Sequence, residues 1–210
     1  MDDRDAAYPV TIDPLASNPS WTILGGFNDE RLGCSVATAG DVNGDGYGDV
    51  IVGISHADSG SGPGTKSDVG AARLYLGNAS GLATTSSWGC AGTTEYEYLG
   101  TSVSTAGDIN GDGLSDVLVG SPGASTGGMV VMYGNRTGNF TQDTVYAQGS
   151  LEEFGTVVAA AGDVNGDNYS DVLVAAPGAL GHLGKVYLFM GSSTGLGSTP
   201  SWSVSGERGY

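Results

Sequence analysis

The chain has 210 residues, with 38 glycines but only 7 prolines, and its formal net charge is −16 from 23 acidic and 7 basic residues. Abundant glycine without matching proline indicates turn-rich folded structure rather than a disordered linker. The acidic balance argues against nucleic acid and anionic membranes as partners, because both are bound through Lys- and Arg-rich surfaces. No stretch of the sequence approaches the about 18 apolar residues of a membrane-spanning helix, and no signal peptide is visible at the N-terminus.

The N-terminal region does not share the pattern of the rest of the chain. Residues 1–20 are expected to form a leader segment. Residues 21–31 contain Trp21-Thr-Ile-Leu-Gly25, which is similar to Trp202-Ser-Val-Ser-Gly206 near the other end of the chain. We therefore predict a surplus strand of the outer type within 21–31, followed by a linker.

The remainder is a threefold repeat with units at 32–92, 93–149 and 150–206, followed by a short C-terminal stub at 207–210. Each unit contains four short runs of β-forming residues bounded by Gly, Asn and Asp, and no segment has a sustained helical period. The units open at Leu32, Leu99 and Phe154, each followed by glycine, and their fourth runs are built on Trp88, Tyr146 and Trp202.

Four-stranded units at this period are typical of β-propeller blades. The acidic loops that mark the units are 67 residues apart (41 to 108) and then 55 residues apart (108 to 163). First strands are poor in bulk, as in Val158-Ala-Ala-Ala-Gly162, which suits an innermost strand where blades crowd around an axis. The run Val50-Ile-Val52 lacks alternation, as expected for a strand buried on both faces. We predict an all-β fold of antiparallel four-stranded blades, three per chain.

Between its first two strands, each unit carries a nine-residue acidic loop, at 41–49, 108–116 and 163–171. Oxygen-bearing side chains occupy positions 1, 3, 5 and 9 of every loop, and position 7 can add its backbone carbonyl. Four hard oxygen ligands within nine residues predict one Ca²⁺ site per loop. The expected ligands are Asp41, Asn43, Asp45, Tyr47 and Asp49 in the first loop, Asp108, Asn110, Asp112, Leu114 and Asp116 in the second, and Asp163, Asn165, Asp167, Tyr169 and Asp171 in the third.

An ordinary acidic turn and an EF-hand are the other interpretations of these loops. Asp and Asn also stabilise ordinary turns, but a plain hairpin needs no acid at position 9, and the pattern occurs three times. An EF-hand requires an acid at position 12, where this chain has Val52, Val119 and Val174. Magnesium is the lesser candidate, because it prefers octahedral, water-rich sites.

The charge of the loops predicts that metal stabilises the fold. Three carboxylates per loop exceed the charge of one Ca²⁺, so an empty loop should repel itself. Three bound ions would add six positive charges and bring the net charge from −16 to −10. Position 6 is Gly46, Gly113 or Asn168, residue types that tolerate a left-handed backbone. The side chain at position 7 is expected to vary freely, since only its carbonyl is used.

The combined pattern resembles the FG-GAP repeats of integrin α-subunit β-propellers over about residues 21–210. It consists of a Phe-Gly or Leu-Gly pair, the Asp-x-Asn-Gly-Asp loop and a Gly-x-Pro end such as Gly120-Ser-Pro122. The name-giving pair is retained at Phe154-Gly155 and becomes Leu-Gly elsewhere, and the first unit has Gly53-Ile-Ser55 in place of the Gly-x-Pro end. The resemblance implies Ca²⁺ at each loop and an extracellular or cell-surface adhesive setting.

Members of that family form seven-bladed rings, whereas this chain has material for three blades. Three blades leave two open apolar flanks, which are costly in water. We favour a homodimer that completes a six-bladed ring. Other stacking of several chains and a fragment of a longer array are the alternatives.

No catalytic elbow, His/Cys metal cluster or paired acid spacing outside the loops is visible, so we expect no enzymatic activity. The sequence predicts a calcium-stabilised, integrin-like module for adhesion or protein–protein interaction. A carbohydrate-binding, lectin-like propeller is the alternative, and an accessory domain of a larger secreted protein is a more distant one.

Overall fold

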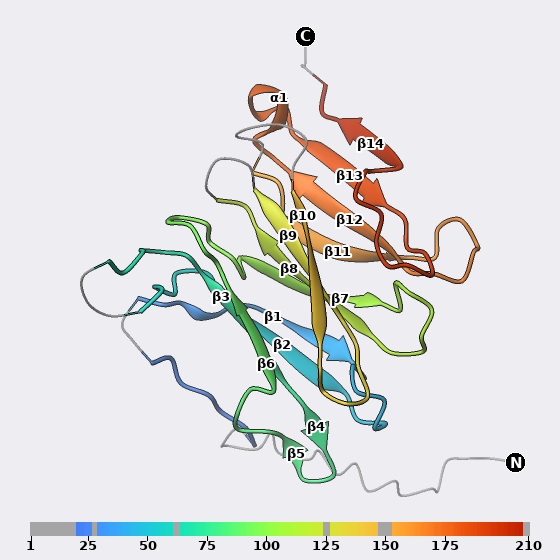
Figure 1. The fold of residues 1–210 in the computed structure, drawn as a ribbon. Coiled ribbons are helices and arrows are strands. Elements are labelled where there is room, and N and C mark those ends of the chain that lie inside the picture. The colour runs from blue at the N-terminus through green and yellow to red at the C-terminus, as the bar shows by residue number, and fades with distance from the viewer. Residues whose placement is uncertain (1–19, 27–28, 61–63, 124–126, 147–152, 208–210) are drawn as a thin grey trace, which may run out of the picture.

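The structure, a computed structural model, describes residues 20–26, 29–60, 64–123, 127–146 and 153–207. Most of the predicted leader and stub therefore lies outside the described residues. Within the described part, the elements are β-strands except for one short helical turn, α1 (Ala179–His182). The strands form three four-stranded antiparallel sheets and one two-stranded hairpin (Figure 1). The prediction of an all-β fold built from four-stranded blades is confirmed.

Each sheet corresponds to one sequence repeat, and its strands follow chain order from the inner to the outer edge. The first blade consists of β1 (Leu32–Gly40), β2 (Asp49–Ile54), β3 (Ala71–Tyr75) and β6 (Trp88–Ala91), with the hairpin β4 (Gly77–Asn78) and β5 (Gly81–Leu82) between its last two strands. The second consists of β7 (Ser102–Gly107), β8 (Asp116–Ser121), β9 (Gly128–Tyr133) and β10 (Thr141–Tyr146). The third consists of β11 (Val157–Gly162), β12 (Asp171–Ala176), β13 (Lys185–Phe189) and β14 (Trp202–Ser205).

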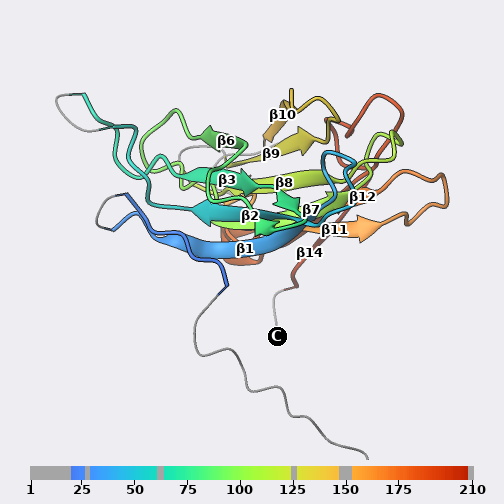
Figure 2. The ribbon, with the colours of Figure 1, turned by 90° about the horizontal axis from the view of Figure 1, so that it is seen from below.

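The hydrophobic core lies between the blades. One cluster joins the first two blades and includes Leu74 and Met132, and a second joins the last two and includes Leu118 and Phe189. Strand β8 contributes to both clusters, since its successive side chains point to opposite faces. Both faces of the middle blade are covered, which explains why its run Val117-Leu-Val119 is apolar without alternation. The inner strands β1, β7 and β11 are neighbours and lie along one side of the assembly, opposite the outer strands β6 and β10 (Figure 2).

The surplus outer-type strand expected within 21–31 is not seen in the residues of that range that the structure describes, 21–26 and 29–31. Residues 21–25 belong to no strand, although the Trp21 indole N–H donates to the Ala83 carbonyl at 3.0 Å. The Trp21 ring also meets the Tyr75 ring edge-on, with centroids 5.2 Å apart. A strand requires a hydrogen-bonded neighbour, and residues 21–25 are paired with none of the strands in the described part of the chain. It packs instead against the outside of the first blade.

Adjacent blades approach each other through glycines of their second strands. A Cβ added to Gly53 would lie 2.0 Å from the Gly100 carbonyl oxygen, and one added to Gly120 would lie 2.1 Å from the Gly155 oxygen. Serine hydroxyls next to these glycines accept backbone N–H groups of the following blade. The two bonds are Val103 N–H to Ser35 at 3.0 Å and Val158 N–H to Ser102 at 3.2 Å. The blade junction is therefore made partly of backbone.

This close approach predicts that Gly120→Ala destabilises the protein. The new methyl must push two backbones apart, so we expect a loss of about 1–3 kcal/mol in the free energy of unfolding, as for other overpacked sites. Urea denaturation measures the loss. Gly197→Ala is the control, because its Cβ would have only ordinary contacts at 3.6 Å and beyond. Equal stability of the two variants would contradict the prediction.

Candidate metal centres

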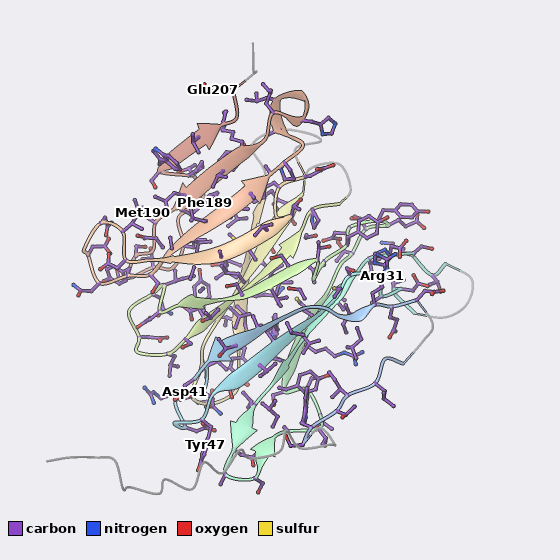
Figure 3. All side chains as sticks on the ribbon, turned by 180° about the vertical axis from the view of Figure 1, so that it is seen from behind. Arg31, Asp41, Tyr47, Phe189, Met190 and Glu207 are labelled. Carbon is purple, nitrogen blue, oxygen red and sulfur yellow. The ribbon has the colours of Figure 1, made fainter. Side chains whose placement is uncertain are left out.

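The three acidic loops lie on the same side of the molecule, at corresponding ends of their blades (Figure 1). Each connects an inner strand to the next strand, and the closing aspartate is the first residue of that strand. The pairs Gly40–Asp49, Gly107–Asp116 and Gly162–Asp171 are in register at the loop bases. Figure 3 shows Asp41 and Tyr47 at this end of the β1–β2 hairpin, with Arg31 at the opposite end of the blade.

The aspartate at position 1 organises the backbone of its loop. In the first loop, Oδ1 of Asp41 accepts the N–H groups of Gly44 and Asp45 at 2.7 and 3.0 Å, and Oδ2 accepts the N–H of Gly46 at 2.8 Å. The same three bonds occur around Asp108 and Asp163. The three loops therefore share one conformation.

Positions 3 and 5 are held against each other. The Asn43 amide donates to Oδ2 of Asp45 at 2.9 Å, and the Asn43 carbonyl oxygen accepts the Asp45 N–H at 3.1 Å. The other oxygen of Asp45 accepts the Tyr47 N–H at 2.9 Å. These contacts recur in the second and third loops. Position 6 has the expected left-handed backbone, with φ of 88° at Gly46, 82° at Gly113 and 69° at Asn168.

The aspartate at position 9 is buried in every loop and is held by two backbone amides. In the second loop, Oδ2 of Asp116 accepts the Ile109 N–H and Oδ1 accepts the Gly134 N–H, both at 2.8 Å. Asp49 and Asp171 make the equivalent bonds at 2.8–3.0 Å. Each carboxylate oxygen has two lone pairs, so every closing aspartate keeps acceptor capacity for a cation.

The electrostatics of the loops favour a bound cation. Burial raises the pKa of Asp116 to about 7, although the N–H groups of Gly134 and Ile109 lower it, and the nearby carboxylates of Asp112 and Asp108 raise it further. Burial likewise raises the pKa of Asp49, with smaller contributions from Asp45 and Asp41 in the same direction. A divalent cation would relieve both the desolvation and the mutual repulsion.

The pKa of Asp163, the exposed aspartate at position 1 of the third loop, is shifted in the opposite direction. The backbone N–H of Asn168, followed by those of Gly166, Asp167 and Asn165, lowers the pKa of Asp163. Bonds to these N–H groups stabilise the ionised form. Position 1 is therefore kept as a carboxylate, the form that a metal ion needs in a ligand.

The donor set fits a hard cation such as Ca²⁺, since every available atom is an oxygen and three carboxylates are present per loop. Within the described residues, no three His, Cys, Asp or Glu side chains converge on one point. The oxygens are instead turned towards the amides of their own loop. The fit therefore rests on donor chemistry and on repulsion between the carboxylates, and the fifteen ligand assignments stay predictions.

The loops also join one blade to the next. The position 1 carbonyl of Asp41 accepts the Ser115 N–H at 3.1 Å, and the position 2 carbonyl of Val42 accepts the Asn135 N–H at 2.8 Å. The second loop repeats both bonds, with Asp108 accepting from Ser170 at 2.8 Å and Ile109 from Ser192 at 3.1 Å.

The position 7 side chains of the second and third loops also contact the preceding blade. A Cβ on Gly44 would lie 2.9 Å from the Leu114 side chain of the next blade, and a Cβ on Gly111 would lie 2.7 Å from the Tyr169 ring. At these two junctions the position 7 side chain therefore packs on the preceding loop, a contact that the sequence analysis did not anticipate.

Sequence reasoning missed the glycines that follow the third strands. Gly77, Gly134 and Gly191 donate the second amide that holds each closing aspartate. Their recurrence at the same place in every repeat was the signal in the sequence that could have indicated this role. The serine at position 8 in the second and third loops was missed as an inter-blade donor for a similar reason.

Comparison with known proteins agrees with this geometry. The family model described as an FG-GAP-like repeat matches residues 41–119 and 108–174. These two matches cover most of the three blades and all three acidic loops. The chain therefore belongs to the FG-GAP repeat family, as the sequence pattern indicated.

The curated relatives are integrin α-subunits. Integrin alpha-V of Gallus gallus is 31% identical over 206 residues, which is 93% of this chain and 18% of that protein. Integrin alpha-3 of Mus musculus is 36% identical over 125 residues, covering 56% of this chain and 12% of the relative. Integrin alpha-PS3 of Drosophila melanogaster is 38% identical over 112 residues, which cover 50% of this chain and 10% of that protein. The chain thus spans less than a fifth of the length of these relatives. None of the helices in the described ranges has the length and apolarity needed to cross a bilayer.

The raised pKa of Asp116 predicts a pH dependence for the metal-free protein. Because its pKa is about 7 in the folded chain against 3.8 for an ordinary aspartate, the folded state holds a proton that the unfolded state has lost between those values. Stability in chelator should therefore fall as the pH rises from about 4 to 7, and excess Ca²⁺ should offset the fall.

Thermal unfolding in chelator across this pH range tests the prediction. Asp116→Asn removes the ionisation, so its midpoint should change less with pH than that of the wild type. Asp143→Asn, on the edge strand β10, is the control for the loss of one acidic side chain. Its thermal midpoint should change with pH as much as that of the wild type. If the thermal midpoint of the wild type changed with pH as little as that of Asp116→Asn, Asp116 would not be the source of the pH dependence.

Proposed function

We propose that the chain is a calcium-stabilised, integrin-like propeller module for adhesion or protein–protein interaction, without catalytic activity. The observation that carries this proposal is the threefold occurrence of one loop conformation with the same donor set. Each loop combines a buried aspartate with mutually repelling carboxylates, and the first two loops are also bonded to the following blade. An ion bound there would stabilise its own loop and the adjoining junction together.

The Ca²⁺ ligands are proposed to be the oxygen side chains at positions 1, 3, 5 and 9 and the carbonyl at position 7 of each loop. Asp41, Asp108 and Asp163 would hold the ion at the loop entrance while they keep the backbone folded. The buried aspartates at position 9 would fix the ion to the sheet. The bound ion supplies charge neutralisation, and its role is structural.

The integrin relatives support an adhesive function and an extracellular or cell-surface location. Both are inferences from similarity, because the chain spans only 18% of integrin alpha-V. The same comparison supports a non-catalytic role. Ligands would be bound by loops at one end of the blades, as exposed connections on a rigid scaffold commonly do.

We further propose that the ring is completed by a second copy of the chain, giving six blades. The support is the exposure of apolar side chains at both ends of the blade row, Val36 on the first blade and Val157 and Val204 on the last. Exposed apolar faces of this kind mark interaction surfaces.

A polar groove beside the second loop favours carbohydrate binding as a second candidate function. It encloses about 370 Å³ and is lined by Asn110, Asp112, Tyr133 and Asn135, among others. Amide, carboxylate and phenol groups around one groove are suited to the hydroxyls of a sugar. Glycan-array binding that is lost on Asn135→Ala would support this function over protein adhesion, whereas binding to no glycan would exclude it.

Calcium titration of the chelator-treated protein tests the main proposal. We expect three bound ions per chain and an increase in the thermal midpoint, since a ligand at 100 times its Kd stabilises by about 2.7 kcal/mol per site. Asp112→Asn removes one charge from the second loop and should weaken one of the three sites. Isothermal titration calorimetry measures the stoichiometry.

Asp143→Asn is the matched control, because it makes the same substitution outside the loops and should leave all three sites intact. Mg²⁺ should produce a smaller stabilisation than Ca²⁺ at equal concentration. Titration without heat or a change in midpoint would refute the calcium role, whatever the oligomeric state of the chain.

A further inference from the structure

Apolar side chains on the two end flanks are more exposed than their counterparts at the junctions within the chain. We call the free face of the first blade the leading flank, which includes Leu32, Val36 and Tyr47. Val36 is 65% exposed, whereas its counterparts Val103 and Val158 are 6% and 3% exposed beneath the preceding blade. The leading flank therefore resembles the buried faces of the second and third blades, but no blade packs against it in the described chain.

The free face of the third blade, which we call the trailing flank, likewise has apolar side chains that no neighbouring blade covers. It includes Val157, Val164, Gly184 and Val204. Val164, at position 2 of the third loop, is 52% exposed, whereas Val42 and Ile109 at the same position are fully buried, at 0%. The trailing flank is the face that a following blade covers in the first two repeats.

Each internal junction is made at two points, of which the first is a bulky residue seated on a glycine. Leu99 lies against Gly70, where an added Cβ would be 2.2 Å from the Leu99 carbonyl oxygen. Phe154 lies against Gly127 in the same way, at 2.6 Å. Both bulky residues are buried and are followed by a glycine with positive φ, 89° at Gly100 and 91° at Gly155.

The chain also contains a third glycine and a third bulky residue of this kind, but they lie on opposite flanks and do not touch each other. Gly184 corresponds to Gly70 and Gly127, but an added Cβ there would meet only Pro177 of its own blade, at 3.8 Å. A groove of about 570 Å³ opens beside it and is lined by Val157, Leu183, Val186 and Val204, among others. The unseated bulky residue is Leu32 on the leading flank, which is followed by Gly33 with a φ of 84°.

The second contact point is the packing of a position 7 side chain on the position 4 glycine of the preceding loop. Leu114 occupies the site over Gly44, and Tyr169 occupies the site over Gly111. Gly166 in the third loop has no neighbour within 4 Å of an added Cβ. Tyr47, the position 7 residue of the first loop, is exposed on the leading flank.

We propose that the trailing flank of one chain binds the leading flank of a second copy, with Leu32 seated in the groove at Gly184 and Tyr47 packed on Gly166. The proposal rests on the six-bladed ring proposed above and names the surfaces that close it. Two chains related by a twofold axis make two such junctions. At each junction the second chain also covers the third acidic loop, which is otherwise open on one side.

Two residues of the trailing flank differ from those at the internal junctions. Ala175 stands where the first two blades have Gly53 and Gly120, and its methyl group keeps the incoming backbone farther away. Val157 stands where they have Ser35 and Ser102, so the hydroxyl that accepts an N–H is missing. The two changes make the junction wider and more apolar, which matches a groove that is filled by side chains.

Sedimentation of the full chain in Ca²⁺ at micromolar concentration tests the proposal. We expect a mass of two chains of 21.0 kDa each. Leu32→Asp on the leading flank and Val204→Asp on the trailing flank should each weaken the dimer at least about thirtyfold, the effect of losing one interfacial hot spot. Tyr146→Asp is the control, because Tyr146 is an exposed aromatic residue on β10 of the middle blade.

Mixing the two flank variants gives a sharper test. A mixed dimer contains one junction with both substitutions and one junction that is fully wild type. An equimolar mixture should therefore form dimers at concentrations where each variant alone is monomeric. Calcium stoichiometry, measured on each variant, shows that its fold and metal sites are intact.

The outcomes separate this inference from the calcium role. A wild-type chain that stays monomeric with three Ca²⁺ bound would overturn the junction and leave the metal sites standing. A wild-type dimer that survives both flank substitutions would place the interface elsewhere. Monomeric variants that fail to form dimers when mixed would also overturn the head-to-tail arrangement.

Discussion

The closing aspartate of each acidic loop is the interaction on which the rest of the structure depends. Its two oxygens hold the amide that begins the loop and the amide that ends the third strand, as Asp116 does with Ile109 and Gly134. One buried carboxylate thereby ties together the inner, second and third strands of a blade. Burying a charge is costly unless it is compensated, and the bound cation that we propose would complete the compensation that the two amides begin.

The carbonyls at the start of the same loop are bonded by the next blade, so the loop belongs to two sheets. Asp41 and Val42 accept N–H groups from the second blade, and the second loop does the same for the third. A metal ion that orders such a loop would act on the junction as well as on the turn. The apolar core between blades and the proposed ion sites are therefore parts of one interface, and neither is a separate module.

Most of the fold could be predicted from the sequence, because the repeat supplies three copies of each local signal. The loops, their left-handed sixth positions and the doubly buried second strands all follow from residue types. Features that depend on a neighbouring blade could not be predicted in this way. The sequence alone does not show that Leu114 and Tyr169 pack on glycines of another loop, or that residues 21–25 lack a strand partner. The roles of Gly77, Gly134 and Gly191 were visible as recurrence, yet their hydrogen bonds required coordinates.

The unlike ends of the chain give any assembly built from it a direction. In the dimer that we propose, a leading flank joins a trailing flank, so subunits would add head to tail. Such heterologous contacts close when the rotation per subunit divides a full turn, and otherwise continue as an open helix. In the proposed junction, the methyl group of Ala175 would widen the contact and so change the rotation between subunits. This one side chain at the end of the third blade would then influence whether copies of the protein form a closed particle or a fibre.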